Sequence, residues 1–299
     1  MLKTNKDKLP MISVSGVVWH PKGGGAGRVS VDGQVLWLTG VGGIVYNAKI
    51  GDPCIGWAAD HLEPGVTTRH KEDKQNESYN ILSCIGNEAT VRSGDAKGAK
   101  GIVTGKHGGC EHVMIYFPQD VLEKMDTDDK ITVKATGQGL EFLDYPEIKV
   151  RNTSPILLEK MNIKEKDNKL KIGVAKILPA EIMGAGLGEV GTACGDYDIT
   201  MFCDEKISHY GLEDLRFGDI VAITNSDTRY GRSYKTGACT IGVVVHGNSF
   251  TAGHGPGVTT LISAKNAVIE PFVNKQANLA DYFCIDKNST HELHNPLRR

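Results

Sequence analysis

Glycine is the feature that most constrains how this chain can fold. The 299-residue sequence holds 36 glycines, and they separate short runs that are rich in valine, isoleucine and threonine. β-branched residues fit extended strands, whereas glycine permits tight turns and bends between strands. The pattern therefore predicts a mainly β protein, rich in β-barrel structure, with a few short helices.

One pentapeptide occurs twice. Pro-Gly-Val-Thr-Thr occupies residues 64–68 and again 256–260, and a histidine lies just before each copy, His61 and His254. Pro-Gly favours a turn in which glycine takes a positive φ, and Val-Thr-Thr favours a strand. A common turn used twice would explain this, but equivalent turn-to-strand junctions in two related halves explain the pair more simply. We then predict that His61 and His254 face a common site.

The two halves share further patterns. A short helix, an acidic turn and a strand are predicted over 119–135, and the same order returns over 211–224. A charged helix is predicted over 157–169, near the join, and the polar segment 73–80 is predicted to be an exposed loop. We expect an N-terminal barrel-like half over 1–152 and a C-terminal barrel-like half with short helices over 153–299.

Charge and hydropathy narrow the class of partner. The net charge is −2 and no basic patch is present, so nucleic acid is not expected to bind. No apolar run approaches the ~20 residues of a membrane helix, and the first residues lack an apolar signal core. We expect a cytoplasmic protein with a small-molecule ligand. The seven cysteines form no C-x-x-C pair, which argues against disulfides or a structural zinc cluster.

Histidines stand beside glycine or acidic residues at several predicted turns. His107 and His112 flank a glycine turn, where two imidazoles could converge on one ion, and His246 and His254 end a short loop. The candidate metal ligands are His61, His107, His246 and His254. Further candidate ligand-binding residues in similar turns are Asp60, His70, Asp95, His112 and Asp227.

Two aspartates are the candidate catalytic carboxylates. Asp196 and Asp198 are two residues apart, so on a strand they share one face and could hold a divalent ion or do acid–base work. Arg229 could orient a substrate carboxylate or phosphate. Gly-Asp is also a common turn, so each aspartate could instead cap a turn or face solvent. A histidine and aspartate set suits zinc, manganese or magnesium, although no H-E-x-x-H motif is present.

The stretch Gly186–Gly191 matches G-x-G-x-x-G. A dinucleotide site needs a strand before this motif and a helix after it, and the sequence after it does not predict a helix. We expect instead that the backbone passes close to a ligand or to a packed strand here.

Residues 215–263 ("LRFGDIVAITNSDTRYGRSYKTGACTIGVVVHGNSFTAGHGPGVTTLIS") and 94–109 ("GDAKGAKGIVTGKHGG") resemble a prokaryotic family catalogued as domain of unknown function 4438. The resemblance covers nearly the whole chain and implies a β-barrel-rich fold and a homo-oligomer. It implies no reaction, so no catalytic residue is carried over. A fainter likeness is to acetamidase/formamidase enzymes, which are also β-rich and have Gly-Asp and histidine loops.

Two functions fit these observations. The first is a metal-assisted hydrolase, or a related lyase, that acts on a small polar molecule such as an amide or cyclic amide. The second is a non-catalytic protein that binds a small anion or other ligand, or that serves oligomeric assembly. Convergence of the histidines with Asp196 and Asp198 on one cleft favours the enzyme, and their dispersal over the surface favours the second function.

Overall fold

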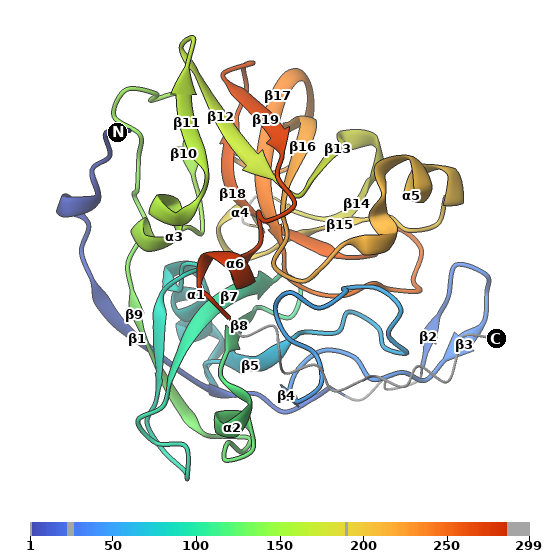
Figure 1. Cartoon of the computed structure of the whole chain (residues 1–299). Coiled ribbons are helices and arrows are strands. Elements are labelled where there is room, and N and C mark those ends of the chain that lie inside the picture. Colours follow the sequence, from blue (N-terminus) through green and yellow to red (C-terminus); the bar gives the residue numbers. More distant parts are fainter. Residues whose placement is uncertain (1, 23–26, 189–190, 286–299) are drawn as a thin grey trace.

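The computed structural model describes residues 2–22, 27–188 and 191–285 and has the mainly β architecture that the sequence predicts (Figure 1). Helices in these ranges are short, and the longest has ten residues. The α-helices are α1 (Asp73–Leu82), α2 (Gln119–Leu122), α3 (Pro155–Lys160), α4 (Gly191–Cys194), α5 (Asp204–Tyr210) and α6 (Leu279–Tyr282), and the 3-10 turns are η1 (Lys6–Lys8), η2 (Ala180–Ile182) and η3 (Leu212–Asp214).

The N-terminal half is a closed barrel of six strands. In order around the barrel they are β1 (Ile12–Val18), β9 (Lys130–Ala135), β6 (Glu88–Val91), β7 (Lys100–His107), β8 (His112–Tyr116) and β5 (Gly65–Arg69). Antiparallel pairing of β5 with β1 closes the ring, and the short β4 (Ile44–Val45) adds to β5. Buried valine, isoleucine and alanine side chains from these strands fill the interior. A separate hairpin joins β2 (Arg28–Val29) to β3 (Val35–Leu36).

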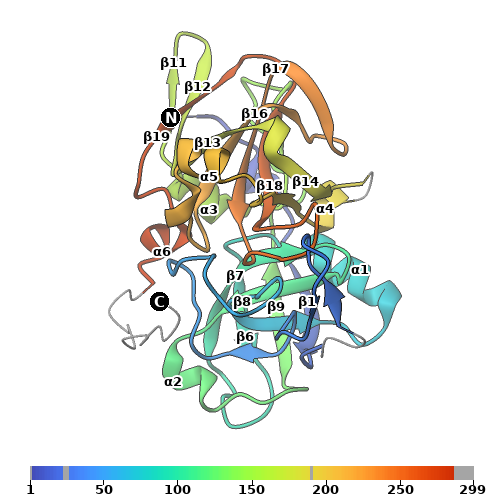
Figure 2. The same ribbon diagram turned by 90° about the vertical axis from the view of Figure 1, so that its right-hand side faces the viewer.

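The C-terminal half is an open half-barrel that lies against the first barrel (Figure 2). Its strands run in the order β13 (Lys176–Pro179), β16 (Ile220–Asp227), β17 (Ser233–Val244), β18 (Gly257–Ala264), β15 (Tyr197–Ile199) and β14 (Met183–Gly186), and β10 (Lys149–Val150) pairs with β18. β18 is buried along its whole length, which fits its nearly continuous apolar and threonine sequence.

Besides the repeated pentapeptide, the halves share a turn that an aspartate side chain stabilises. The carboxylate of Asp129, just before β9, accepts a hydrogen bond from the backbone N–H of Asp126 at 3.0 Å. Asp219, just before β16, accepts from the N–H of Arg216 at 2.9 Å in the same way. Each aspartate thus closes the turn that leads from a short helix into a strand, as expected for related halves.

The predicted charged helix over 157–169 is wrong beyond its first turn. Helix α3 begins after Ser154, whose hydroxyl accepts the N–H of Leu157 at 3.1 Å, and it ends at Lys160. The chain then forms the hairpin of β11 (Ile163–Lys166) and β12 (Lys169–Val174), which β19 (Ile269–Val273) joins in parallel. Asp167 and Asn168 both have positive φ, the geometry of a tight hairpin turn, so local turn chemistry overrides the charge pattern.

The predicted exposed loop at 73–80 is also wrong, because this segment forms most of α1. One face of α1 buries Asn76, Tyr79 and Asn80, at the i, i+3, i+4 spacing of a helix. The Tyr79 hydroxyl lies 2.7 Å from that of Thr68, and the ring packs where Gly16 leaves room. The buried face is largely polar, which explains why composition alone indicated a loop.

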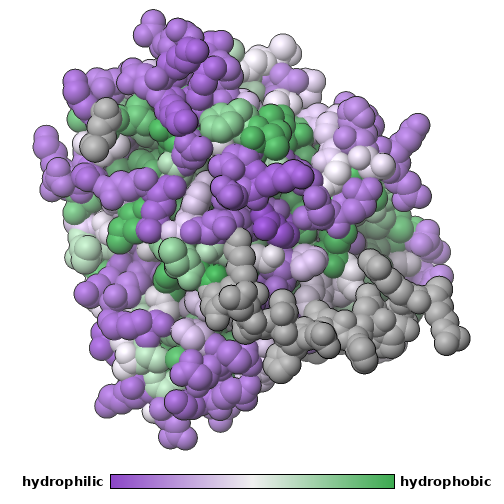
Figure 3. All heavy atoms as spheres, in the orientation of Figure 1, coloured by the Kyte–Doolittle hydropathy of each residue, from purple (hydrophilic) through white to green (hydrophobic). Residues whose placement is uncertain are grey.

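Two hydrophobic cores support the halves, and the larger one extends from the half-barrel across the interface between them. Hydrophilic side chains cover much of the face seen in Figure 3, with smaller apolar areas between them. No helix in the described ranges is long and apolar enough to cross a membrane.

Candidate functional site

Backbone hydrogen bonds join the two histidine loops across the halves. The N–H of His61 donates to the carbonyl of Asn248 at 3.0 Å, and the N–H of Gly247 donates to the carbonyl of Leu62 at 2.8 Å. His61 adopts a φ of 57°, a left-handed conformation that is uncommon outside glycine, and its residue is only 5 % exposed. The fold therefore holds His61 in a fixed direction, toward the C-terminal half.

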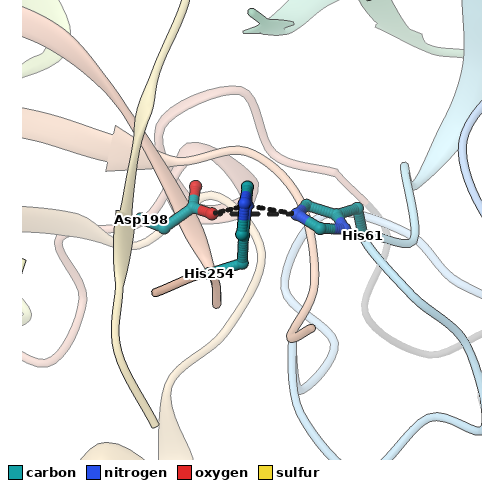
Figure 4. A group of neighbouring side chains, drawn as sticks. All are labelled: His61, Asp198 and His254. Carbon is teal, nitrogen blue, oxygen red and sulfur yellow. Dashed lines mark hydrogen bonds and ion pairs between the residues drawn. The ribbon is translucent and has the colours of Figure 1, made fainter. Parts of the chain in front are cut away.

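His61, His254 and Asp198 form the first group of the site (Figure 4). His61 Nε2 lies 3.1 Å from His254 Nδ1, which lies 3.0 Å from Asp198 Oδ2. Asp198 Oδ2 is also 3.7 Å from His61 Nε2. The predicted meeting of the two repeated histidines is confirmed by this contact, and it occurs at a carboxylate carried by β15.

His107, Asp196 and His246 form the second group. His107 ends β7 of the first barrel, whereas His246 follows β17 of the half-barrel, and their ring centroids are 4.1 Å apart. His246 Nε2 lies 2.8 Å from Asp196 Oδ2. One potential ligand atom from each of the three residues lies within 4.8 Å of the other two.

The two groups meet at one carboxylate. Asp198 Oδ2 faces His254 and His61, and Asp198 Oδ1 lies 3.6 Å from His246 Nε2. The ring centroids of His61 and His246 are 5.1 Å apart. Four imidazoles and two carboxylates therefore converge, and both halves of the chain contribute to them.

The Nδ1 atoms of three imidazoles are held by oxygen atoms behind the site. His61 Nδ1 lies 3.1 Å from Asp60 Oδ2, and His107 Nδ1 lies 2.6 Å from Glu63 Oε1. His246 Nδ1 donates to the carbonyl of Gly247 at 2.9 Å. Such contacts fix the orientation and tautomer of a metal-ligating histidine and leave Nε2 as its ligand atom.

Glu63 is the functional residue that the sequence analysis missed. It is completely buried, and its carboxylate accepts hydrogen bonds from Thr67 Oγ1 at 2.6 Å and from the N–H of Gly42 at 2.8 Å. His112 Nδ1 lies 3.0 Å from the same carboxylate, so His112 shares Glu63 with His107 and does not join the convergence of side chains. The signal was available, because Glu63 is two residues from His61 and one before the repeated pentapeptide.

The charges in the site shift one another's protonation. Burial would raise the pKa of Asp198, but contacts with His246, His254 and His61 hold it well below its usual range. Burial would lower the pKa of His246, but Asp196 and Asp198 raise it well above its ordinary value. The metal-free site therefore favours an ionised Asp198 beside a protonated His246.

Burial and neighbouring charges also set the pKa values of the groups behind the histidines. Burial opposes ionisation of Glu63, yet His112 and His107 hold its pKa well below the ordinary value. His61 and Ser249 likewise lower the pKa of Asp60 against the effect of its burial. Burial raises the pKa of Cys110 well above that of a free thiol, with a further increase from Glu63. Cys110 is therefore a protonated thiol and is poorly suited to act as a nucleophile.

A lysine that precedes His107 ties the halves together beneath the site. Lys106 is completely buried, and its Nζ donates to Asn152 Oδ1 at 2.9 Å and to the carbonyls of Ala193 and Ile81 at 3.0 and 3.1 Å. Burial lowers the pKa of Lys106 to about 8. The N–H of Gly108, just beyond His107, donates to Asp196 Oδ1 at 2.7 Å. These bonds set the end of β7 against Asp196.

The site opens into a cavity of about 870 Å³. Five side chains of the site line it, namely His61, His107, His254, Asp196 and Asp198. Lys22, Arg28 and Arg69 add positive charge to its wall, and α1 adds carboxylates and amides. The cavity can therefore hold a small polar molecule against the histidines and aspartates.

The glycine-rich stretch 186–191 contributes backbone to the same cavity, through Gly186, Gly188 and Gly191. Contrary to expectation, a helix does follow it, but this helix, α4, has only four residues. A side chain at Gly186 would collide with the backbone of Asp196 and Tyr197, so close packing of β14 against β15 requires glycine there. The expected close backbone approach is confirmed.

Four other predicted residues lie elsewhere. Asp95 is exposed, and His70 Nδ1 accepts the N–H of Glu72 at 3.1 Å. Arg229 pairs with Asp227, with Nη2 2.9 Å from Oδ2, and neither is among the described residues that line the large cavity. Arg229 is therefore placed to stabilise its own turn, in which its N–H also donates to Asp227. The polar sequence 289–299 predicts a surface tail that carries His291 and His294, and these residues lie outside the described residues.

The protein is thus a two-part β protein, in which a closed barrel joins a half-barrel and a group of histidines and aspartates lies where the two meet. The family models described as "Domain of unknown function (DUF4438), N-terminal" and "C-terminal" match residues 27–159 and 160–283. The chain belongs to the DUF4438 family. Its structure is similar to the crystal structure of TM1086, with a TM-score of 0.90 and 45 % sequence identity over 94 % of this chain and 99 % of that chain. No curated protein matches the chain.

Proposed function

We propose that this protein is a metal-dependent hydrolase that acts on a small polar molecule, such as an amide or cyclic amide. One observation carries the proposal. Three imidazoles have Nδ1 held by Asp60, Glu63 and a backbone carbonyl, and they converge with Asp196, Asp198 and His254 beside one cavity. Metal-ligating histidines almost always have such support on the ring nitrogen that does not bind the ion.

The ligand set fits a divalent ion. Imidazole nitrogens and carboxylate oxygens suit zinc or manganese. The thiol of Cys110 lies 3.7 Å from Glu63 Oε1, and burial raises its pKa, so it is less suited to bind an ion. A bound divalent ion supplies Lewis acidity, which polarises a carbonyl and makes water more acidic. His61, His254 and Asp198, or His107, His246 and Asp196, are the residues that would hold it.

The remaining chemistry falls to the chain's own groups. Asp196 and Asp198 line the cavity, and one of these carboxylates is placed to accept a proton from the attacking water. The neighbouring histidines hold the pKa of Asp198 well below its usual range. The cavity wall offers Lys22 and Arg28 to an anionic part of a substrate, the role expected of Arg229. The buried surroundings of the site limit access of bulk water and strengthen these electrostatic interactions.

Metal content is the direct test. Protein purified without a histidine tag or chelator should contain a stoichiometric transition metal by elemental mass spectrometry. His107→Ala and His254→Ala should lower this content, whereas His70→Ala, a matched histidine outside the site, should not. The metal-loaded protein should then hydrolyse members of an amide and cyclic amide panel. Protein that neither retains nor takes up zinc, manganese or magnesium would contradict the proposal, and ligand binding without turnover would favour a binding protein.

A further inference from the structure

The geometry points to a centre of two divalent ions bridged by Asp198. This inference rests on the proposed metal-dependent function and adds the number of ions and the assignment of their ligands. His61 and His254 would bind the first ion, and His107, His246 and Asp196 would bind the second. Two-ion hydrolytic centres place their ions about 3.5–4 Å apart and clamp the attacking and leaving groups between them.

The bridging assignment follows from the two oxygens of Asp198. Its Oδ2 lies 3.0 Å from His254 Nδ1 and 3.7 Å from His61 Nε2. Its Oδ1 lies 3.6 Å from His246 Nε2, on the side of the second group. A carboxylate whose oxygens face separate sets of ligands can bind one ion with each oxygen.

The number of ligands also exceeds what one ion needs. Zinc takes about four protein or water ligands, and in catalytic sites only three come from the protein. Here six side chains converge, so a single ion would leave at least two buried polar groups without a ligand role. With two ions, two side chains would bind the first ion, three would bind the second, and the sixth, Asp198, would bind both. Each ion would then keep open positions toward the cavity.

Each set of ligands has its own outer support. Asp60 holds His61 of the first set, and Asp60 is itself held by the hydroxyl of Ser249 at 2.6 Å. Glu63 holds His107 of the second set, and the carbonyl of Gly247 holds His246. One ion would require orientation of only one of these sets, whereas both are fixed.

Charge balance also favours two ions. Four buried carboxylates stand in or directly behind the site, those of Asp60, Glu63, Asp196 and Asp198. Two divalent ions carry the charge that neutralises four carboxylates, whereas one ion neutralises two of them. The cation beside Asp60, Arg28, is more than half exposed and is therefore largely screened by solvent.

Native mass spectrometry with zinc, combined with elemental analysis, tests the inference on the full chain. The wild-type protein should bind two ions. His254→Ala and His107→Ala should each bind one, and His70→Ala should bind two. Circular dichroism and the unfolding temperature of each metal-free variant will show that the protein has folded.

Manganese supplies the test of the bridge. Two Mn²⁺ ions that share Asp198 should give an exchange-coupled electron paramagnetic resonance spectrum, and Asp198→Ala should abolish that coupling. One ion in the wild type, two ions without coupling, or loss of both ions from each single histidine variant would overturn the two-ion centre. Binding of no ion at all would instead refute the proposed function, so the two failures are distinguishable.

Discussion

The two histidine loops of this protein have the same sequence pattern in different surroundings. His61 precedes a strand of the closed barrel, and its side chain is 6 % exposed. His254 precedes a strand of the open half-barrel, and its side chain is 35 % exposed. Both histidines reach Asp198. The buried loop therefore provides a fixed ligand, while the more exposed loop completes the site from the solvent side.

The glycine of the repeated pentapeptide shows that one sequence can meet two different needs. Gly65 has a φ of +75°, as the predicted turn requires, and a side chain there would also lie 2.9 Å from the carbonyl oxygen of Ile115. Gly257 does not have a positive φ, so the predicted turn geometry is wrong for the second copy. A Cβ at Gly257 would instead collide with Asp196 Oδ2 and His246 Nε2. Gly65 is therefore needed for the backbone conformation, and Gly257 is needed because a side chain there would occupy the space of Asp196 and His246.

Gly257→Ala should have the largest effect. The new methyl group must displace Asp196 or His246, both buried, and overpacking of this kind costs about 1–3 kcal/mol. Because the displaced groups are proposed ligands, bound metal should fall by at least about tenfold, as losses of far less direct support do. Elemental analysis and urea unfolding measure the two effects.

Gly65→Ala and Gly253→Ala are the matched controls for this substitution. Gly65→Ala should cost stability through its positive φ and the contact with Ile115, but it should retain its metal. Gly253 has a φ of +79° and open space around its Cβ position, so alanine there should cost only about 1–2 kcal/mol. If Gly257→Ala retained full metal content, the proposed division of roles between the two glycines would be wrong.

Asp60→Asn should have the next largest effect. The substitution keeps the size of the side chain but removes the charge behind His61, and loss of such outer support costs about 10- to 100-fold in metal affinity. Competition with a fluorescent chelator measures the affinity. Asp95→Asn, at an exposed aspartate, is the control and should leave it unchanged. An unchanged affinity in Asp60→Asn would show that His61 needs no orienting partner.

The metal-free protein should show a pH dependence that arises at the buried loop. Burial would lower the pKa of His61, but Asp198 and Asp60 raise it above its ordinary value of about 6.5. Its stabilising contribution is therefore complete below pH ~6.5 and is lost as the pH rises through the elevated pKa. Each unit of elevation corresponds to about 1.4 kcal/mol.

Urea unfolding in the presence of chelator measures this dependence. The difference in free energy of unfolding between the wild type and His61→Gln should shrink from about pH 6 to pH 9. The corresponding difference for His254→Gln, on the more exposed loop, provides the comparison. A difference for His61→Gln that grows with pH would mean that this histidine is buried in its neutral form.

The sequence predicted what depends on local pattern. Glycine spacing and β-branched runs indicated the β-rich fold, and the repeated pentapeptide led to the contact between His61 and His254. It did not predict α1, because the buried face of this helix is polar. It also did not predict the β11–β12 hairpin, because the charged residues of this segment indicated a helix, whereas Asp167 and Asn168 form a turn. These are places where tertiary contacts or turn chemistry outweigh composition.

The site was predictable in part for a related reason. The loop histidines beside glycine that the sequence indicated do converge. Glu63 was missed although it lies beside His61 and the repeated pentapeptide, because its contact with His107, 44 residues away, is not visible in the sequence. The same limitation applies to Asp95, which is exposed, and to Asp227 and Arg229, whose carboxylate and guanidinium groups bind each other. Only the contact between the halves decides which polar turns converge.

Arg229→Ala should have the smallest effect on bound metal, and it tests whether the Asp227 turn belongs to the site. The guanidinium pairs with Asp227, where the two side chains are 15 % and 10 % exposed, and lies beside Tyr230, with Cζ 5.6 Å from the ring centroid. Because the substitution leaves the largely buried Asp227 carboxylate without this partner, the unfolding free energy should fall by about 1–3 kcal/mol. Metal content should stay at the wild-type value, since Arg229 contacts none of the proposed ligands. A loss of metal in Arg229→Ala, measured beside Lys235→Ala as a control for surface charge, would place the Asp227 turn in the functional site after all.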